Sequence, residues 1–249
     1  MPRIFIELCY KGTGYAGFQV QKNANTIQAE VEKAFSIYFK INFSLTGSSR
    51  TDAGVHALQN YFHTDMDEMP EEDALANSIY HINAILPASI VVKRIFRVKD
   101  DFHSRFNADS RTYQYQVYQH KNPFLADTAY FFPFPLDIAL LQAAAMLLYT
   151  YTDYESFAKR NSQVHTYQCT ISKSEWIVEN DRLKYTVTAN RFLRGMVRGL
   201  VGTMLKVGCK KISIEEFKDI IESKNAAATD FSVPPQGLCL INVAYEHQL

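Results

Sequence analysis

The segment GSSRTDAGVH, residues 47–56, places a carboxylate, Asp52, two residues after a cation, Arg50. Ala53 and Gly54 follow, so the backbone can turn tightly and little side-chain bulk covers the carboxylate. A nearby cation favours the ionised form of an aspartate, and an ionised, poorly shielded carboxylate can act as a nucleophile or a general base. From the residues alone a plain turn is the favoured interpretation, and glycoside hydrolysis would need a second carboxylate that the segment does not offer.

A second candidate for chemistry is NRFLRGMVRGLVG at 190–202. Its apolar residues recur with helical spacing and predict a helix over 191–206, with Arg191, Arg194 and Arg198 on another face. Three glycines lie close to that face, although each weakens a helix by roughly 1 kcal/mol relative to alanine. We therefore expect a backbone or a ligand to approach closely. The arginines could contact phosphates or pair with a buried carboxylate, and ordinary helix packing explains them equally well.

The strand-like segment SRTYQYQVY at 110–118 carries aromatic side chains on one face. Tyr113, Tyr115 and Val117 alternate with polar residues, as in a half-buried strand. Aromatic residues in such a position usually belong to the core, and they can also provide a stacking surface for an unpaired base. Farther along, VPPQGLCL at 233–240 predicts a stiff turn that leads into the last strand.

The glycines of KGTGYAG at 11–17 match the GxGxxG fingerprint of dinucleotide-binding folds. In such folds the third glycine already lies in a helix whose N-terminus faces the pyrophosphate. Here the following residues, FQVQKNAN, have no helical period. The sequence therefore predicts no nucleotide cofactor. The four cysteines are far apart and the histidines have no ligand spacing, so we expect reduced thiols, no metal site and a cytoplasmic protein.

The charge of the chain is balanced but unevenly distributed. The 249 residues carry 26 basic and 26 acidic side chains. Residues 65–73 hold six acids and no base, whereas residues 182–214 hold eight bases and no acid. A neutral chain can in this way present a basic face to an anionic partner. The longest nearly apolar run, at 138–149, is too short to span a bilayer, so no membrane association is expected.

The elements that position these residues follow a repeated order. Asn25 and Gln28 predict a capping box for the first helix. In the first half, the patterns predict strands at 3–10, 42–46, 57–64 and 90–98 and helices at 27–39 and 71–82. In the second half they predict strands at 111–119, 170–179, 183–190 and 238–246, helices at 137–149 and 191–206, and an extra helix at 213–222. Two tandem split β-α-β units, 1–105 and 106–249, indicate an α+β protein with antiparallel sheets.

Taken together, these motifs resemble the tRNA pseudouridine synthases of the TruA family. The resemblance runs nearly end to end and is carried by YKGTGYAGFQVQ, GSSRTDAGVHA, FHSRFNADSRTYQY, NRFLRGMVRGLVG and VPPQGLCL. It implies two ferredoxin-like halves whose sheets form a pseudouridine synthase platform with a central cleft.

The resemblance also implies a role for individual residues. Asp52 matches the catalytic aspartate, Tyr113 matches the tyrosine that stacks on the target base, and Arg198 matches the arginine that pairs with the catalytic carboxylate. Leu238 matches an apolar residue that borders the base, and Arg50 matches a loop arginine that helps to open the RNA. Whether the carboxylate attacks C1′, removes the C2′ proton or adds to C6 of the base stays open.

The implied activity is the isomerisation of uridine to pseudouridine at positions 38–40 of the tRNA anticodon stem-loop. Family members of this kind are cofactor-free cytoplasmic homodimers. We expect RNA affinity to depend on basic residues of the second half, namely Arg191, Arg194, Lys206, Lys210 and Lys211. Two alternatives are an RNA-binding or tRNA-folding protein without catalysis and a synthase with a different RNA target.

Overall fold

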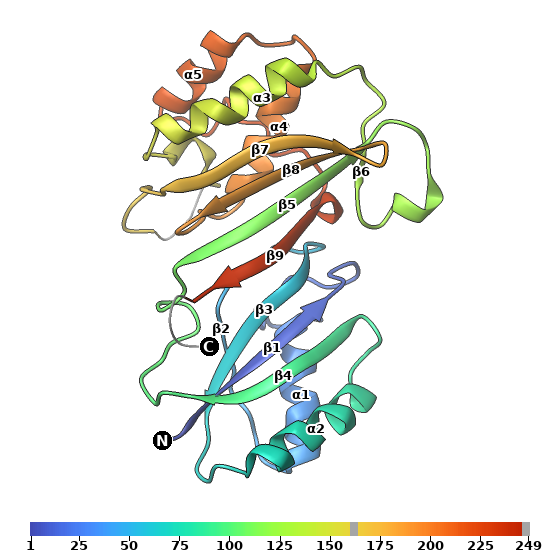
Figure 1. Ribbon diagram of the computed structural model, residues 1–249, viewed down its shortest axis with the longest axis vertical. Helices are drawn as coiled ribbons and strands as arrows, with labels where there is room; N and C mark the ends of the chain where they lie inside the picture. The colour runs from blue at the N-terminus through green and yellow to red at the C-terminus, as the bar shows by residue number, and fades with distance from the viewer. Residues whose placement is uncertain (160–163, 246–249) are drawn as a thin grey trace. The chain divides into compact units, whose positions relative to one another are not determined.

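The computed structural model describes residues 1–159 and 164–245 and divides the chain into two compact units. The first unit comprises Met1–Asp109 together with the chain from Leu240 onward, and the second comprises Ser110–Cys239. Figure 1 labels the elements of both units. Each unit combines antiparallel strands with helices, so the predicted α+β class is confirmed. The division at residue 105, the continuous platform and the central cleft stay predictions.

The first unit is built around a sheet whose strands run in the order β4-β1-β3-β9, with the short β2 paired to β3. The central strand β1 pairs antiparallel with both β3 and β4. Helices α1 and α2 contact each other, and α2 packs on β4. The bounds are β1 (Arg3–Tyr10), α1 (Ile27–Phe39), β2 (Thr46–Gly47), β3 (His56–Asp65), α2 (Glu72–Ile85), β4 (Ile90–Val98) and β9 (Leu238–Ala244). The predicted strand at 238–246 includes residue 246, which lies outside the described residues.

Two local predictions for the first unit are wrong. The N-cap of α1 is Thr26, whose side chain accepts from the Ala29 amide at 3.3 Å, and not Asn25. The strand predicted at 42–46 is reduced to β2, because side chains of α1 bind the backbone before it. Ser36 Oγ accepts from the amide of Phe43, and Glu32 Oε1 accepts from the amide of Leu45. These amides cannot then join a sheet ladder.

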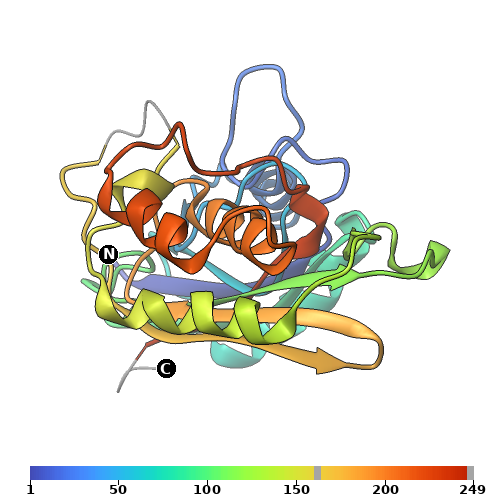
Figure 2. The ribbon, with the colours of Figure 1, turned by 90° about the horizontal axis from the view of Figure 1, so that it is seen from above.

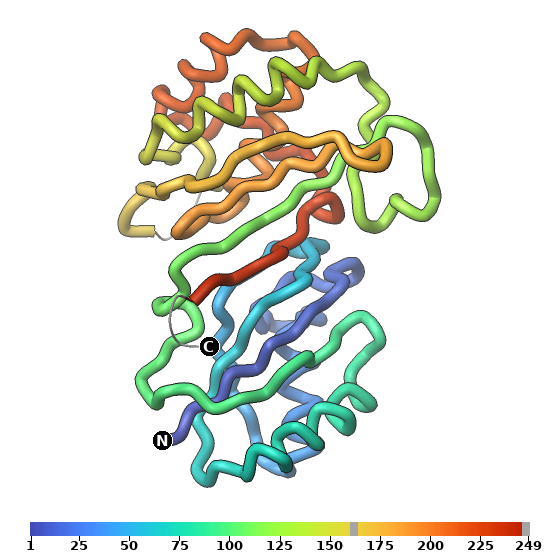
Figure 3. The backbone as a smooth tube through the Cα atoms, viewed as in Figure 1, coloured from blue at the N-terminus to red at the C-terminus, as the bar shows by residue number. Residues whose placement is uncertain are grey.

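The second unit contains an antiparallel sheet in the order β5-β8-β7, and β6 pairs parallel with β5. Helix α3 contacts β7 and α4, and Figure 2 shows it lying along the β7–β8 hairpin. The long connection from β5 to α3 is the green loop in Figure 3. The bounds are β5 (Ser110–Tyr118), β6 (Tyr130–Phe131), α3 (Ile138–Leu147), β7 (Ile171–Glu179), β8 (Arg182–Ala189), α4 (Met196–Gly208), α5 (Ile214–Glu222) and the 3₁₀ turns η1 (Pro123–Leu125), η2 (Leu148–Thr150), η3 (Glu155–Phe157) and η4 (Pro235–Gly237).

Helix α4 is the most deeply buried helix described in the second unit, since all its residues except Arg198 and Lys206 are buried. It contacts α3 and α5. Among the described residues, no helix is both long enough and apolar enough to cross a membrane. The core of this unit also contains the fully buried rings of Tyr115, Tyr154 and Tyr185.

Candidate active site

Asp52 lies in a tight turn that the sequence predicts correctly. The Val55 amide donates to the Asp52 carbonyl at 3.1 Å, and Gly54 has φ +78°, a conformation that disfavours residues with a Cβ. Asp52 is partly exposed, and Ala53 and Arg50 are exposed. The residues on either side of Arg50, Ser49 and Thr51, are buried. The loop is therefore anchored by its small polar residues while the two charged side chains reach solvent.

Two glycines of the GxGxxG-like segment, Gly12 and Gly17, lie in close contact with the Asp52 turn. A Cβ on Gly12 would lie 2.0 Å from the Val55 carbonyl oxygen, and one on Gly17 would lie 3.2 Å from the Thr51 carbonyl oxygen. Gly17 also has φ +114°. The Phe18 amide donates to that same Thr51 carbonyl at 3.1 Å. The glycine segment thus packs directly against the backbone of the Asp52 turn, a contact that the spacing of the glycines alone did not reveal.

Tyr113 lies on β5 of the second unit, opposite Val187 of β8. Its side chain is 9% exposed, and its ring meets the ring of Phe192 edge-on, with 5.1 Å between the centroids. Phe192 is a neighbour that the sequence analysis missed. Its position two residues after the strand predicted at 183–190, inside the arginine-rich segment 190–202, gave the one available signal.

Arg198 lies in the first turn of α4, where backbone carbonyls hold its guanidinium. Nε donates to the Val233 carbonyl at 2.8 Å, and Nη2 donates to the Phe231 carbonyl at 3.3 Å. These two bonds use Nε and Nη2, and neither uses Nη1. The guanidinium is thus fixed in orientation and keeps donors for an anionic partner.

The helix predicted over 191–206 begins five residues later, at Met196, so the predicted stripe of three arginines is wrong. Gly195 has φ +74°, which interrupts any helix from its N-terminal side. The Lys159 amide donates to the Arg194 carbonyl and fixes the preceding segment. Arg191 is partly exposed and Arg194 is exposed, both outside the helix. Only Arg198 belongs to α4.

The expected close approach to the glycines of α4 is confirmed: backbone approaches Gly202, and side chains approach Gly199. A Cβ on Gly202 would lie 2.2 Å from the Asp230 carbonyl oxygen, and one on Gly199 would lie 2.8 Å from the Phe231 ring. The segment that binds Arg198 can therefore run directly against the helix. Asp230 pairs with Lys206 at 3.4 Å.

Leu238 begins β9 directly after η4 and is 7% exposed. The turn before it packs on β5, because a Cβ on Gly237 would lie 2.5 Å from the Tyr115 ring. The Tyr115 hydroxyl donates to the Pro234 carbonyl at 2.7 Å, and burial raises the pKa of this phenol. Residues 231–238 therefore connect Arg198, Leu238 and the β5 strand of Tyr113 within the second unit. Arg50 and Asp52 belong to the first unit.

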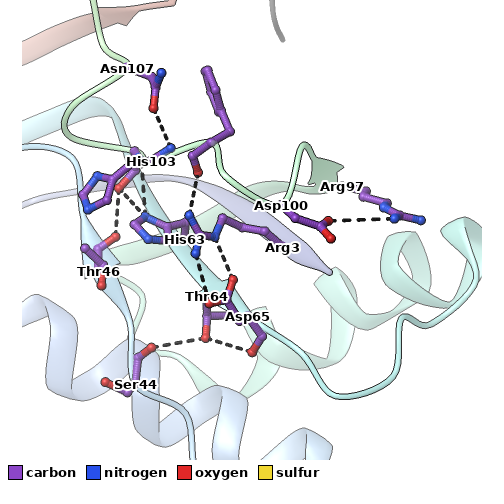
Figure 4. Close-up of polar contacts among 12 residues, drawn as sticks. Arg3, Ser44, Thr46, His63, Thr64, Asp65, Arg97, Asp100, His103 and Asn107 are labelled. Atoms are coloured by element: carbon purple, nitrogen blue, oxygen red, sulfur yellow. Dashed lines mark hydrogen bonds and ion pairs between the residues drawn. The ribbon is translucent and has the colours of Figure 1, made fainter. Parts of the chain in front are cut away.

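A polar cluster separate from the Asp52 turn lies at the C-terminal end of β3 (Figure 4). His63 Nδ1 is 2.8 Å from Ser104 Oγ, and burial lowers the pKa of His63 to about 4. Arg3 and Asp65 form a bidentate pair, with Nε 2.7 Å and Nη2 3.0 Å from the two carboxylate oxygens. The cluster ties β1, β3 and the chain after β4 together. In the described part of the chain, no group of three or more His, Cys, Asp or Glu side chains could hold a metal ion.

Comparison with known proteins finds relatives that match nearly the whole length of this chain. A family model described as tRNA pseudouridine synthase matches residues 144–246. A tRNA pseudouridine synthase A from Azobacteroides pseudotrichonymphae is 40% identical over 98% of this chain and 97% of its own length. A protein of the same name from Parabacteroides distasonis is 39% identical over 100% of this chain and 98% of its own length. The chain belongs to the tRNA pseudouridine synthase A family.

Membership in the tRNA pseudouridine synthase A family confirms the resemblance inferred from the motifs and the predicted enzyme class. A more distant relative from Staphylococcus aureus, also named tRNA pseudouridine synthase A, is 35% identical over 96% of this chain. The segment matched by the family model contains Arg198 and Leu238, and the full-length relatives also cover the segments of Asp52 and Tyr113. The roles of these individual residues stay proposals.

Proposed function

We propose that this protein isomerises uridine to pseudouridine at positions 38–40 of the tRNA anticodon stem-loop, with Asp52 as the catalytic carboxylate. The observation that carries the proposal is the Asp52 turn. A partly exposed carboxylate stands on a backbone that is braced by the glycine segment and by buried neighbours, in a chain of this family. Such a rigid support presents a reactive group in a fixed orientation.

The chemistry is balanced within the substrate. The N1–C1′ bond breaks, the uracil turns, C5 bonds to C1′, C5 loses a proton and N1 gains one. No net oxidation or hydrolysis occurs. The target base must leave its stack to be reached, and stacking of a base on an aromatic ring contributes about 1–3 kcal/mol. In this proposal Tyr113 supplies that ring, Leu238 borders the base, and Arg198 orients the carboxylate.

The remaining proposed roles concern RNA binding. Arg50 is exposed beside the Asp52 turn and helps to open the RNA around the target. Arg191 and Arg194 contact phosphates, consistent with their positions outside the helix, where they are partly or fully exposed. The enzyme acts in the cytoplasm as a homodimer and needs no cofactor.

The test maps pseudouridine in unmodified tRNA transcripts treated with the wild-type protein or with Asp52→Asn. We expect pseudouridine at positions 38–40 with the wild type and a loss of about 10⁴-fold in rate with Asp52→Asn, since an amide can act neither as nucleophile nor as base. Because Asp52 is partly exposed, the variant should keep the wild-type melting temperature.

Three results would contradict the proposal in different ways. Wild-type activity in Asp52→Asn would exclude the carboxylate as catalyst. Pseudouridine at other positions would exclude the proposed target. Tight tRNA binding without any new pseudouridine would favour the binding-only alternative.

A further inference from the structure

The loop that carries Asp52 is held by a buried amide on the neighbouring strand. Asn60 of β3 is fully buried and uses both ends of its side chain. Its Oδ1 accepts from Ser48 Oγ at 2.8 Å and from the Tyr61 amide at 2.9 Å. Its Nδ2 donates to the Ser49 carbonyl at 3.0 Å and to the Tyr10 hydroxyl at 3.1 Å. These four bonds match the four hydrogen-bonding positions of a carboxamide, so the group is fixed in orientation.

The anchoring continues to the residue next to Asp52. The Tyr10 hydroxyl, which accepts from Asn60, lies 2.8 Å from Thr51 Oγ1 in a buried hydrogen bond. Thr51 is 7% exposed, and its carbonyl accepts from the Phe18 amide. The series of hydrogen bonds from Asn60 through Tyr10 to Thr51 therefore ends one residue before Asp52. Buried hydrogen bonds of this kind strengthen one another because water does not compete for them.

We propose that Asn60, Tyr10 and Thr51 are positioning residues for Asp52, and that the Thr51 hydroxyl sets the orientation of the carboxylate without contacting the substrate. The inference rests on the proposed function, since it assigns the support of the proposed catalyst. A loss of orientation lowers the rate of the chemical step, whereas the affinity for tRNA depends on other surfaces.

The Thr51→Val variant tests the proposal, because valine keeps the branched shape and removes only the hydroxyl. We expect the single-turnover rate at saturating enzyme to fall by about 10- to 100-fold, the range for a small misplacement of a reacting group. The dissociation constant for tRNA should stay within twofold. Thr51→Ser restores the hydroxyl and should recover the rate to within threefold of the wild type.

Thr64→Val provides a matched control on the same unit. Thr64 lies on β3, is also 7% exposed, and donates through Oγ1 to the Ser44 carbonyl at 3.2 Å (Figure 4). This change removes a buried hydroxyl of equal exposure from the other end of the strand, so it should lower the melting temperature slightly and leave the single-turnover rate unchanged.

The proposal is overturned if Thr51→Val reacts within twofold of Thr64→Val, if Thr51→Ser is as slow as Thr51→Val, or if the loss appears in tRNA affinity. Should Thr51→Val fail to fold, Tyr10→Phe removes the same bond from the other side, and a wild-type rate there overturns the proposal. Failure of the proposed function looks different, because Asp52→Asn would then remain active or the wild type would produce no pseudouridine.

Discussion

The loop around Asp52 in the first unit and the segment around Arg198 in the second unit solve a similar problem by different means. Each has a glycine with positive φ, Gly54 at +78° and Gly195 at +74°, and each presents a charged side chain next to a chain reversal. In the first loop the neighbours of the charged residue are held, through Asn60 and Tyr10. In the second segment the charged group itself is held by two carbonyls.

The two sites therefore respond to different substitutions. The described hydrogen bonds of the Asp52 turn go to its backbone and to its neighbours, so its position depends on residues that never meet the substrate. Arg198 is fixed by its own donors, so its position depends on the guanidinium geometry. Changes to neighbouring residues should therefore matter most in the first unit, and changes to the arginine itself in the second.

Among the changes that test this contrast, Gly12→Ala should have the largest effect on stability, because it disturbs the backbone contact that supports the Asp52 turn. The new Cβ would lie 2.0 Å from the Val55 carbonyl oxygen, so backbone has to move. We expect a loss of about 3 kcal/mol in the free energy of unfolding, measured by urea denaturation. Because Val55 closes the turn with Asp52, the single-turnover rate should also fall by more than about 10-fold.

Gly14→Ala is the matched control for Gly12→Ala. Gly14 has φ +87° and nothing within 4 Å of a Cβ, so the change costs only backbone strain of about 1 kcal/mol. Its catalytic rate should be normal. Equal rates in the two variants would show that the glycine segment does not support the turn.

Arg198→Lys keeps the charge of the side chain and removes its planar geometry. A lysine has a single nitrogen and cannot reproduce donation to both the Val233 and Phe231 carbonyls. We expect the turnover number to fall by about 10-fold and the stability to fall by about 2 kcal/mol, since hydrogen bonds from charged groups contribute roughly 1.5–3 kcal/mol each.

Arg97→Lys is the control for a surface arginine. The Arg97 side chain is 59% exposed, and its Nη2 lies 3.9 Å from Asp100 Oδ1. An exposed ion pair of this kind contributes little to the free energy of unfolding. Both rate and stability should stay close to wild type. A normal turnover number in Arg198→Lys would remove the contrast between the two sites.

A smaller effect is expected from Arg194→Ala, which tests RNA binding apart from orientation. Arg194 is exposed, so its loss should weaken tRNA binding several-fold and reduce the slope of log affinity against log salt by about 1. The turnover number at saturating tRNA should be unchanged. The slope is measured by filter binding between about 50 and 200 mM salt. If Arg194→Ala and the wild type have the same slope, Arg194 does not contact a phosphate.

The sequence predicted one of these sites better than the other for a physical reason. The turn at Asp52 depends on adjacent residues, so Ala53 and Gly54 announce it. The true start of α4 depends on Gly195 and on the distant Lys159, and helical periodicity does not register such a contact. Apart from the bond to the adjacent Tyr61 amide, the Asn60 network and the Gly12 contact join residues more than ten positions apart. A single sequence shows those partners only as ordinary polar residues and as glycines that match a nucleotide-binding pattern.

The smallest effect separates the stability of the first unit from its catalytic loop. His63 lies on β3, seven residues beyond His56, and burial lowers its pKa to about 4 against an unfolded value near 6.5. Well above pH 6.5 His63 is neutral in both the folded and the unfolded protein, so it adds no pH dependence to the free energy of unfolding there. As the pH falls below 6.5 the unfolded chain takes up the proton first, and stability is lost progressively down to pH 4.

The pH prediction compares the wild type with His63→Asn, whose side-chain oxygen can replace Nδ1 as the acceptor of the Ser104 amide. Between pH 7.5 and 5.5 the wild type should lose about 1 kcal/mol more of its free energy of unfolding than the variant does. The single-turnover rate of the folded protein at pH 7.5 should be the same in both, because the Thr51 and Asn60 contacts are untouched. Parallel stability profiles would mean that other groups govern acid stability, and a slower variant would mean that the two polar clusters on β3 are coupled.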